Sequence, residues 1–213
     1  MKDFLTRPAW IEINLDNFEN NIKEIKSIIT PGTEIMSVVK SDAYRLGAIP
    51  LSYVSRELGI KFYGVATLSE ALRFKKEFPD TSVLILGYTP AHLFEDAVKN
   101  EITLTIYTLE DARKLDEIAG YLGKKAKLHL AVDSGMSRIG FIPGENSLKE
   151  VKKIFELGNI FVEGIFSHFA ASESDPEFTK RQFIAFTNFI KEIEDHGYKI
   201  TYKHIANSSS VLY

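Results

Sequence analysis

Residues 103–133, TLTIYTLEDARKLDEIAGYLGKKAKLHLAVD, contain two short β-type runs separated by one amphipathic helical pattern. The β-type runs are 103–107 and 127–133, and the helical pattern is 109–121. Thr108 with Asp111 places a capping hydroxyl and an early acid where a new helix exposes its backbone amides and the positive end of its dipole. This order predicts a strand, a covering helix and a second strand parallel to the first.

The same alternation extends over the rest of the chain. Apolar runs such as VLILG at 83–87 and FVEGIF at 161–166 indicate strands buried on both faces, as in a parallel sheet covered by helices. Ser69 with Glu70 marks another helix start. The seven expected strands are 34–40, 62–66, 83–87, 103–107, 127–133, 160–168 and 200–207, and the clearest helices are 17–29, 68–77, 109–121, 148–157 and 176–196.

Seven strands in this alternation predict an α/β fold, either an incomplete (β/α)8 barrel of the TIM type or an open doubly wound sheet. The barrel is favoured, because eight closed strands leave no exposed edge. A chain of 213 residues with 45% apolar content fits one core, so we expect residues 1–213 to form a single domain truncated before its last unit. The segment 9–15 alternates like a half-buried strand outside the barrel, and we expect its partner sheet in a further part of the protein.

Composition narrows the possible partners. The net charge of −3, with acids and bases interleaved, leaves no basic stripe for nucleic-acid phosphates. The absence of cysteine excludes disulfides, zinc–thiolate sites and thiol nucleophiles. Charged residues interrupt the apolar residues of the N-terminus, so neither a signal peptide nor a membrane span is expected there. We therefore expect a cytoplasmic protein that binds neither nucleic acid nor membrane.

Reactive side chains fall where the expected strands end. In a (β/α) barrel these ends share one face and build the functional site. Lys40 ends IMSVVK, Arg138 lies in VDSGMSRIGF, His168 lies in GIFSHFA, and Asn207 with Ser208 lies in HIANSSS. We expect all five to face one pocket.

Lys40 is the leading candidate for chemistry. An amine at the end of an apolar strand is partly desolvated, which frees its lone pair to form an imine with an aldehyde. The alternative is a lysine that leaves the sheet and extends its ammonium group into solvent. Tyr44, four residues later, offers a phenol that can donate a hydrogen bond to a phosphate while Lys40 reaches an aldehyde carbon. This pairing favours the reactive lysine.

The motif VVKSDAY at 38–44 resembles the sequence around the lysine that binds pyridoxal 5'-phosphate (PLP) in the alanine racemase family. The stretch RPAWIEINLDNFENNI at 7–22 is similar to the opening of that family. VDSGMSRIGF, GIFSHFAASE and HIANSSSVL follow in the family's order, so the resemblance covers essentially the whole chain. It implies PLP as the cofactor and Lys40 as the catalytic lysine that holds it as a Schiff base.

The resemblance also implies roles for the other strand-end residues. Tyr44 and Ser208 would bind the phosphate, with backbone help near Asn207. Arg138 would hydrogen-bond the phenolic oxygen of the ring, and its planar guanidinium could also approach a substrate carboxylate. His168 would lie by the pyridine ring in an orienting role, supporting an arginine beyond Tyr213.

Each of these residues has a plainer interpretation. Arg138 could be a surface cation, His168 an ordinary structural histidine, NSSS a simple turn, and His204 a buried histidine bonded to the backbone. No metal site is expected, because His129, His168 and His204 lie on different strands and neither HxH nor HExxH occurs.

The sequence departs from the family pattern in two places. YRLGA at 44–48 stands where the family usually has YGHG, so Arg45 either adds a cation for phosphate or points outward. Ala131 stands where some relatives carry a lysine that positions the ring arginine, so Arg138 needs another partner here.

The resemblance implies a parent enzyme that interconverts L- and D-alanine for peptidoglycan. In the family a second base comes from a tyrosine in the C-terminal β domain of the partner subunit of a homodimer. Nothing after Tyr213 supplies that domain here, so we expect these residues alone to bind PLP weakly or not at all and to be inactive. Two alternatives stay open: a single-domain PLP-carrying protein without racemase activity, and a racemase for serine or another small amino acid.

Overall fold

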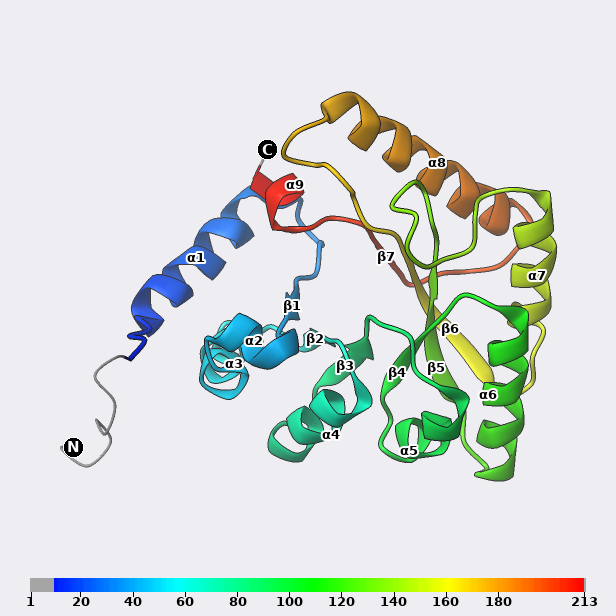
Figure 1. The fold of residues 1–213 in the computed structure, drawn as a ribbon, viewed down its shortest axis with the longest axis horizontal. Helices are drawn as coiled ribbons and strands as arrows, with labels where there is room; N and C mark the ends of the chain where they lie inside the picture. The colour runs from blue at the N-terminus through cyan, green and yellow to red at the C-terminus, as the bar shows by residue number, and fades with distance from the viewer. Residues whose placement is uncertain (1–9, 213) are drawn as a thin grey trace.

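The computed structural model describes residues 10–212 and contains one sheet of seven parallel strands (Figure 1). The strands lie side by side in the order in which they occur along the chain, so β1 and β7 are the two ends of the sheet. All seven expected strands are confirmed. They are β1 (Met36–Val38), β2 (Phe62–Val65), β3 (Ser82–Ile85), β4 (Thr103–Ile106), β5 (Ala126–Ala131), β6 (Ile160–Phe166) and β7 (Tyr202–His204).

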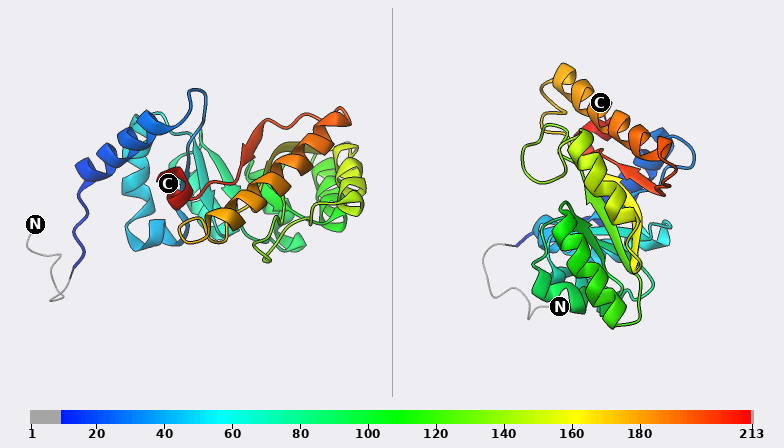
Figure 2. Two further views of the ribbon diagram at one scale, coloured as in Figure 1. Left: turned by 90° about the horizontal axis from the view of Figure 1, so that it is seen from above. Right: turned by 90° about the vertical axis from the view of Figure 1, so that its right-hand side faces the viewer.

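Helices form an arc around the outside of the curled sheet, which is the arrangement of an incomplete (β/α) barrel of the TIM type (Figures 1 and 2). Parallel pairing between every pair of successive strands places all strand C-termini at one end of this barrel. The helices are α1 (Leu15–Ile28), α2 (Lys40–Arg45), α3 (Ala48–Glu57), α4 (Leu68–Glu77), the 3₁₀ helix η1 (Ala91–Leu93), α5 (Phe94–Lys99), α6 (Leu109–Tyr121), α7 (Glu145–Phe155), α8 (Pro176–Asp195) and α9 (Ser208–Leu212).

The five helices expected from the sequence are present, and α4 and α6 have the expected bounds. The long helix α3 was not expected. It begins after Gly47 and carries Pro50 in its first turn, where a helix does not need the missing N–H. The proline made this helix hard to recognise in the sequence, but it did not prevent the helix from forming. The other helices that were not expected, α2, η1, α5 and α9, have six residues or fewer, too short for a periodic pattern.

Both helix starts assigned from the sequence are correct, but only one of the two capping residues is. Thr108 caps α6, accepting a hydrogen bond from the amide of Asp111 at 3.1 Å. The cap of α4 is Thr67, whose hydroxyl accepts from the amide of Glu70 at 3.3 Å. Ser69 lies inside the first turn, so its assignment as the capping residue was wrong by two positions.

The expected outer strand at 9–15 is absent from its described part. Residues 10–14 form no strand, and Trp10 and Ile11 are 63% and 69% exposed. Asn14 instead caps α1 by accepting a hydrogen bond from the amide of Asn17 at 2.9 Å. The preference of asparagine for the N-cap position therefore outweighs the alternating pattern of this segment. Ala9 lies outside the described residues.

The apolar core lies between the curled sheet and the helices that cover it. Leu84, Leu104, Leu128 and Ile165 are fully buried on neighbouring strands, as the apolar runs predicted. Each such side chain stabilises the fold by about 1.5–3 kcal/mol relative to its exposed state. The helices contribute their inner faces, through residues such as Ala71, Leu115, Ile154 and Ile193.

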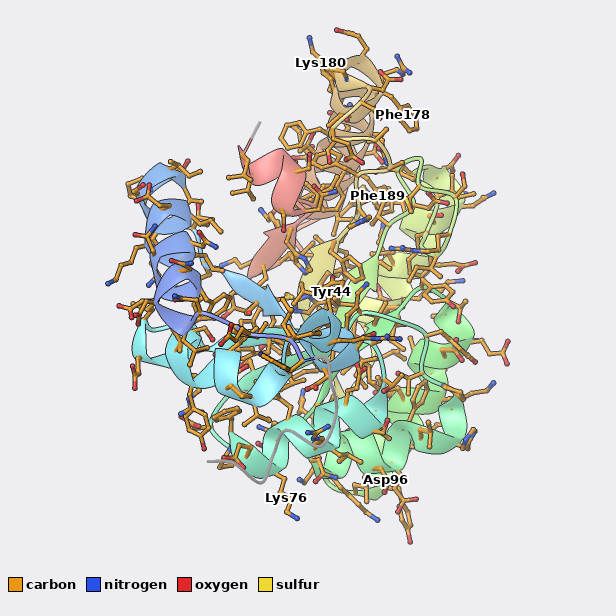
Figure 3. All side chains as sticks on the ribbon, turned by 60° about the vertical axis from the view of Figure 1, so that its left-hand side comes forward. Tyr44, Lys76, Asp96, Phe178, Lys180 and Phe189 are labelled. Carbon is orange, nitrogen blue, oxygen red and sulfur yellow. The ribbon has the colours of Figure 1, made fainter. Side chains whose placement is uncertain are left out.

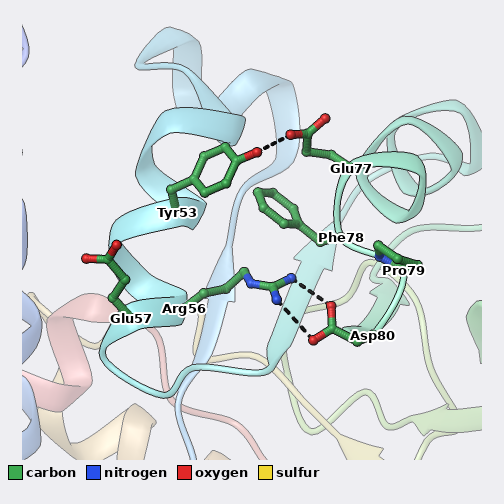
Figure 4. Close-up of a pocket in the computed structure, with 7 residues that line it drawn as sticks. All are labelled: Tyr53, Arg56, Glu57, Glu77, Phe78, Pro79 and Asp80. Carbon is green, nitrogen blue, oxygen red and sulfur yellow. Dashed lines mark hydrogen bonds and ion pairs between the residues drawn. The ribbon is translucent and has the colours of Figure 1, made fainter.

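A surface hollow separates α3 from the end of α4 (Figure 4). Arg56 donates two hydrogen bonds to Asp80, at 2.9 and 3.0 Å, and Tyr53 donates to Glu77. The Arg56 guanidinium holds the pKa of the Asp80 carboxyl below its usual value. The polar groups of this hollow therefore satisfy one another and join two neighbouring helices.

Among the described residues, no helix is both long enough and apolar enough to cross a membrane.

Replacing Gly164 by alanine is predicted to destabilise the barrel interior. A Cβ at this position in β6 would lie 2.5 Å from the ring of the fully buried His129. Such overpacking costs about 1–3 kcal/mol, which urea unfolding can measure. Gly158→Ala is the matched control, because its Cβ meets nothing within 4 Å. Equal stability of the two variants would contradict this description of the core.

Candidate functional site

The segment that follows β1 forms a turn of left-handed helix. Val39 is buried, Lys40 begins α2, and the next four residues, Ser41 to Tyr44, have φ between 51° and 56°. None of the four is glycine, and left-handed helical geometry costs about 1–2 kcal/mol for each such residue. No sequence pattern indicated this turn. A conformation of this cost persists only where its surroundings stabilise it, and such segments occur often at functional sites.

Backbone hydrogen bonds and the carboxylate of Asp42 tie this turn to the neighbouring elements. Val39 donates to the carbonyl of Gly64 in β2 at 2.8 Å, which continues the pairing of the sheet. Farther on, the carboxylate of Asp42 accepts from the amide of Ala48 at 2.9 Å, which ties the turn to the start of α3. Ala43 is buried beneath the turn. The backbone of Lys40 is thus tied to the end of the sheet.

Lys40 and Tyr44 lie at the two ends of this turn. Lys40 is half-buried, and its Nζ lies 5.9 Å from the centre of the Tyr44 ring. Tyr44 is 61% exposed, and Figure 3 marks its position on α2. Arg45, at the end of α2, has an exposed side chain. The turn presents an amine and a phenol at the C-terminal end of the barrel.

His168 lies at the same end of the barrel as Lys40. It follows β6 by two residues and is half-buried. Burial lowers the pKa of His168, and the positive charges of Arg138 and Lys40 lower it further. The expected grouping of Lys40, Arg138 and His168 at one end of the barrel is therefore present.

Arg138 lies in the loop between β5 and α7. The carboxylate of Asp133 shapes this loop by accepting from the amides of Gly135 and Ser137 at 3.0 and 2.9 Å. The side chain of Arg138 is exposed and, among residues 10–212, makes neither an ion pair nor a side-chain hydrogen bond. Its guanidinium donors are available to an anionic group.

Asn207 and Ser208 follow β7, at the same end of the barrel. The side-chain oxygen of Asn207 accepts from the amide of Ser210 at 3.0 Å and from the hydroxyl of Ser172 at 2.9 Å. NSSS therefore begins a short helix rather than a simple turn. The side chain of Asn207 is engaged, whereas Ser208 is exposed.

A buried polar network that the sequence did not predict lies inside the barrel. Nδ1 of His129 lies 2.9 Å from Nε2 of His204, and Nε2 of His129 lies 3.6 Å from the carboxylate of Glu163. Lys127 at 3.3 Å and the hydroxyl of Thr103 at 3.3 Å also contact Glu163. The alternative of a His204 bonded to the backbone is therefore wrong, because its partner is an imidazole. Glu163 was not predicted as part of a polar network because it lies within the otherwise apolar run FVEGIF.

The pKa values in this network favour a pair of neutral imidazoles. Burial, with His129 beside it, lowers the pKa of His204 to about 3. Burial also lowers the pKa of His129, although Glu163 opposes this shift. Burial raises the pKa of Glu163, but His129 and Lys127 together outweigh it and leave a net lowering. Among the described residues no group of three or more potential ligands could hold a metal ion.

The donors at the C-terminal end of the barrel form a chemically specific set. They comprise a half-buried amine, two hydroxyl groups and an unpaired guanidinium, from Lys40, Tyr44, Ser208 and Arg138. An amine can condense with an aldehyde, whereas hydroxyl and guanidinium groups bind phosphate and phenolate oxygens. The set fits an aldehyde that carries a phosphate and an acidic hydroxyl.

Comparison with known proteins matches residues 13–213 to the family model described as alanine racemase, N-terminal domain. The alanine racemase of Methanococcus maripaludis is 42% identical over 209 residues, which are 98% of this chain and 56% of that protein. The alanine racemase of Clostridium perfringens strain SM101 is 42% identical over 211 residues, 99% of this chain and 54% of that protein. The chain thus spans about half the length of these curated relatives.

Solved structures show the same similarity. The alanine racemase of Clostridium difficile 630 in complex with cycloserine superposes with a TM-score of 0.93 at 39% identity, over 97% of this chain and 57% of that chain. The histidine racemase of Leuconostoc mesenteroides subsp. sake superposes with a TM-score of 0.87 at 25% identity, over 97% and 55%.

The neutral histidine pair predicts a loss of stability in mild acid. The unfolded chain takes up a proton on His204 near its usual pKa of 6.5, whereas the folded chain resists protonation until about 3. The stability that His204 contributes is therefore present above pH 6.5 and falls as the pH drops toward 3, by about 1.4 kcal/mol per pH unit. Urea unfolding at several pH values between about 7 and 5 measures this slope, because an ordinary histidine takes up its proton in this interval. His204→Asn should reduce this slope without abolishing it, because the lowered pKa values of His129 and His168 also contribute, and an unchanged slope would refute the assignment.

The pKa of His168 reports whether the site is assembled. Removing the charge in Arg138→Ala should raise this pKa toward its usual value, although burial, the larger cause, remains. Titration of the imidazole followed by NMR measures the shift. Lys149→Ala is the control, because Lys149 pairs with Glu145 on α7 and does not contribute to the shift of His168. An identical response to both substitutions would mean that Arg138 does not face His168.

Proposed function

This chain belongs to the family of alanine racemase N-terminal domains, and from that premise we propose that it forms the cofactor-binding part of a PLP-dependent amino-acid racemase. The observation that carries the proposal is the position of Lys40. Lys40 is half-buried and stands on a fixed turn at the C-terminal end of a (β/α) barrel, its Nζ lies beside a phenol, and both Lys40 and Arg138 lower the pKa of His168. Active sites of barrels of this type lie at that end.

Lys40 is the proposed catalytic residue. Bound PLP supplies an electron sink that makes the α-hydrogen of an amino acid acidic. The amine of Lys40 is suited to hold the cofactor through its aldehyde and afterwards to remove or return a proton at the α-carbon.

The neighbouring side chains bind and orient. Tyr44 and Ser208 donate hydrogen bonds to the phosphate, with the backbone near Asn207 assisting. Arg138 donates to the phenolic oxygen of the ring and can approach the substrate carboxylate, for which its planar fork is suited. His168 lies by the pyridine ring of the cofactor and orients it. It stays neutral because burial and two nearby cations lower its pKa.

Racemisation needs an acid/base group on each face of the α-carbon. Lys40 serves one face. The family resemblance assigns the other to a tyrosine in a C-terminal domain of a partner subunit, beyond the half of the relatives that this chain spans. We therefore propose that the full protein acts as a cytoplasmic homodimer, and that residues 1–213 alone bind PLP weakly and do not racemise.

Alanine is the proposed substrate, because the curated relatives are named alanine racemases. The histidine racemase that superposes on this chain supports a second candidate, a racemase for another amino acid. A barrel of this shape is compatible with both names, so the shape of the barrel alone does not select the substrate's side chain. Assays of the full-length protein with several amino acids distinguish the two. The relatives' names give no support to a single-domain PLP carrier without racemase activity.

Lys40 is predicted to be the lysine that PLP labels. After incubation with PLP and reduction with borohydride, the cofactor should be fixed to the peptide that contains Lys40. Lys40→Ala should abolish this label, whereas Lys61→Ala, which removes an exposed lysine before β2, should keep it. Peptide mapping by mass spectrometry provides the measurement. A label that stays on another lysine in all three proteins would refute the assignment.

A further inference from the structure

We propose that Glu70 is a positioning residue for Lys40, fixing the left-handed turn on which the lysine stands. This inference rests on the proposed function of Lys40. The sequence indicated only that Glu70 lies at the start of a helix. The structure places its carboxylate between two strand ends.

One carboxylate joins the two segments. Oε1 of Glu70 accepts a hydrogen bond from the amide of Ser41 at 2.9 Å, and Oε2 accepts from the amide of Ala66 at 2.7 Å. Ser41 directly follows Lys40, and Ala66 directly follows β2. Hydrogen bonds to an ionised carboxylate are about twice as strong as neutral ones. Glu70 therefore ties the first peptide of the turn to the end of the neighbouring strand.

Glu70 is itself well fixed. It lies in the first turn of α4, where its amide donates to the capping hydroxyl of Thr67 and the helix dipole favours a negative charge. In a capping box the acid at this position bonds the amide of the capping residue. Here Oε2 bonds Ala66, one residue earlier, and Oε1 is left for Ser41. The first turn of α4 therefore also holds the left-handed turn in place, through the carboxylate of Glu70.

The turn needs such support because packing holds only part of it. Beneath it lies a hollow of about 230 Å³, lined by residues that include Val39, Asp42, Glu70 and Arg73. Ser41 and Asp42 are exposed, so few apolar contacts oppose their return to right-handed or extended geometry. The peptide between Lys40 and Ser41 carries the amide that Glu70 holds. Rotation of that peptide would redirect the side chain of Lys40.

Amide hydrogen exchange at Ser41 tests the contact without any cofactor. In Glu70→Ala the Ser41 amide should exchange at least about tenfold faster than in wild type, the loss expected for one charge-assisted hydrogen bond. Glu70→Gln should be intermediate, because an amide side chain keeps one acceptor oxygen. Thr67→Val is the matched control: it removes the cap of the same helix and leaves the carboxylate in place. Equal acceleration in Thr67→Val and Glu70→Ala, or none in Glu70→Ala, overturns the inference.

Selective labelling by PLP and borohydride tests the consequence for Lys40. The ratio of label on Lys40 to label on all other lysines should fall about tenfold in Glu70→Ala and stay near the wild-type ratio in Thr67→Val. Equal ratios in wild type and Glu70→Ala overturn the role of Glu70 while leaving the proposed function intact. A full-length wild-type protein without selective label on Lys40 overturns the proposed function instead, and the exchange of the Ser41 amide still shows whether Glu70 holds the turn.

Discussion

The left-handed turn from Ser41 to Tyr44 is the constraint on which the site depends. Four successive residues with side chains adopt a conformation that their own sterics oppose, so the surrounding structure must stabilise it. The support comes from the sheet through Val39 and Gly64, and from the start of α3 through Asp42 and Ala48. Its result is an amine and a phenol held close together at the strand ends of a barrel.

Charge is distributed in two layers around this turn. At the opening, Lys40 and Arg138 lie near a half-buried His168, whose pKa is lowered by burial and by these two residues. Deeper inside, His129 and His204 form a neutral pair, and Glu163 is balanced by Lys127. The opening is therefore suited to an anionic ligand, whereas the interior holds polar groups that contact one another, with Nε2 of His129 left without a hydrogen-bond partner among the described residues. One barrel therefore keeps its buried polar groups in the interior and its ligand-binding groups at the opening.

The sequence predicted the sheet well because most strands lie in apolar runs bounded by polar residues. All seven strands and five of the longer helices follow from such patterns, whereas Pro50 concealed α3 and the cap at Asn14 replaced an expected strand. The strand-end positions of Lys40, Arg138 and His168 were also predictable. The left-handed turn was not, because no glycine marks it, and Glu70 resembled an ordinary helix-start acid. The buried Glu163 escaped notice because its partners come from other strands, a relation that one-dimensional patterns do not contain.

A crystal structure of the chain after treatment with PLP and borohydride tests the central claim most directly. The account predicts positive φ from Ser41 to Tyr44, continuous electron density from Nζ of Lys40 to the pyridoxyl ring, and the guanidinium of Arg138 beside the ring oxygen. A right-handed or extended backbone at these four residues, with the Lys40 amine in bulk solvent and the cofactor on another lysine, would contradict it.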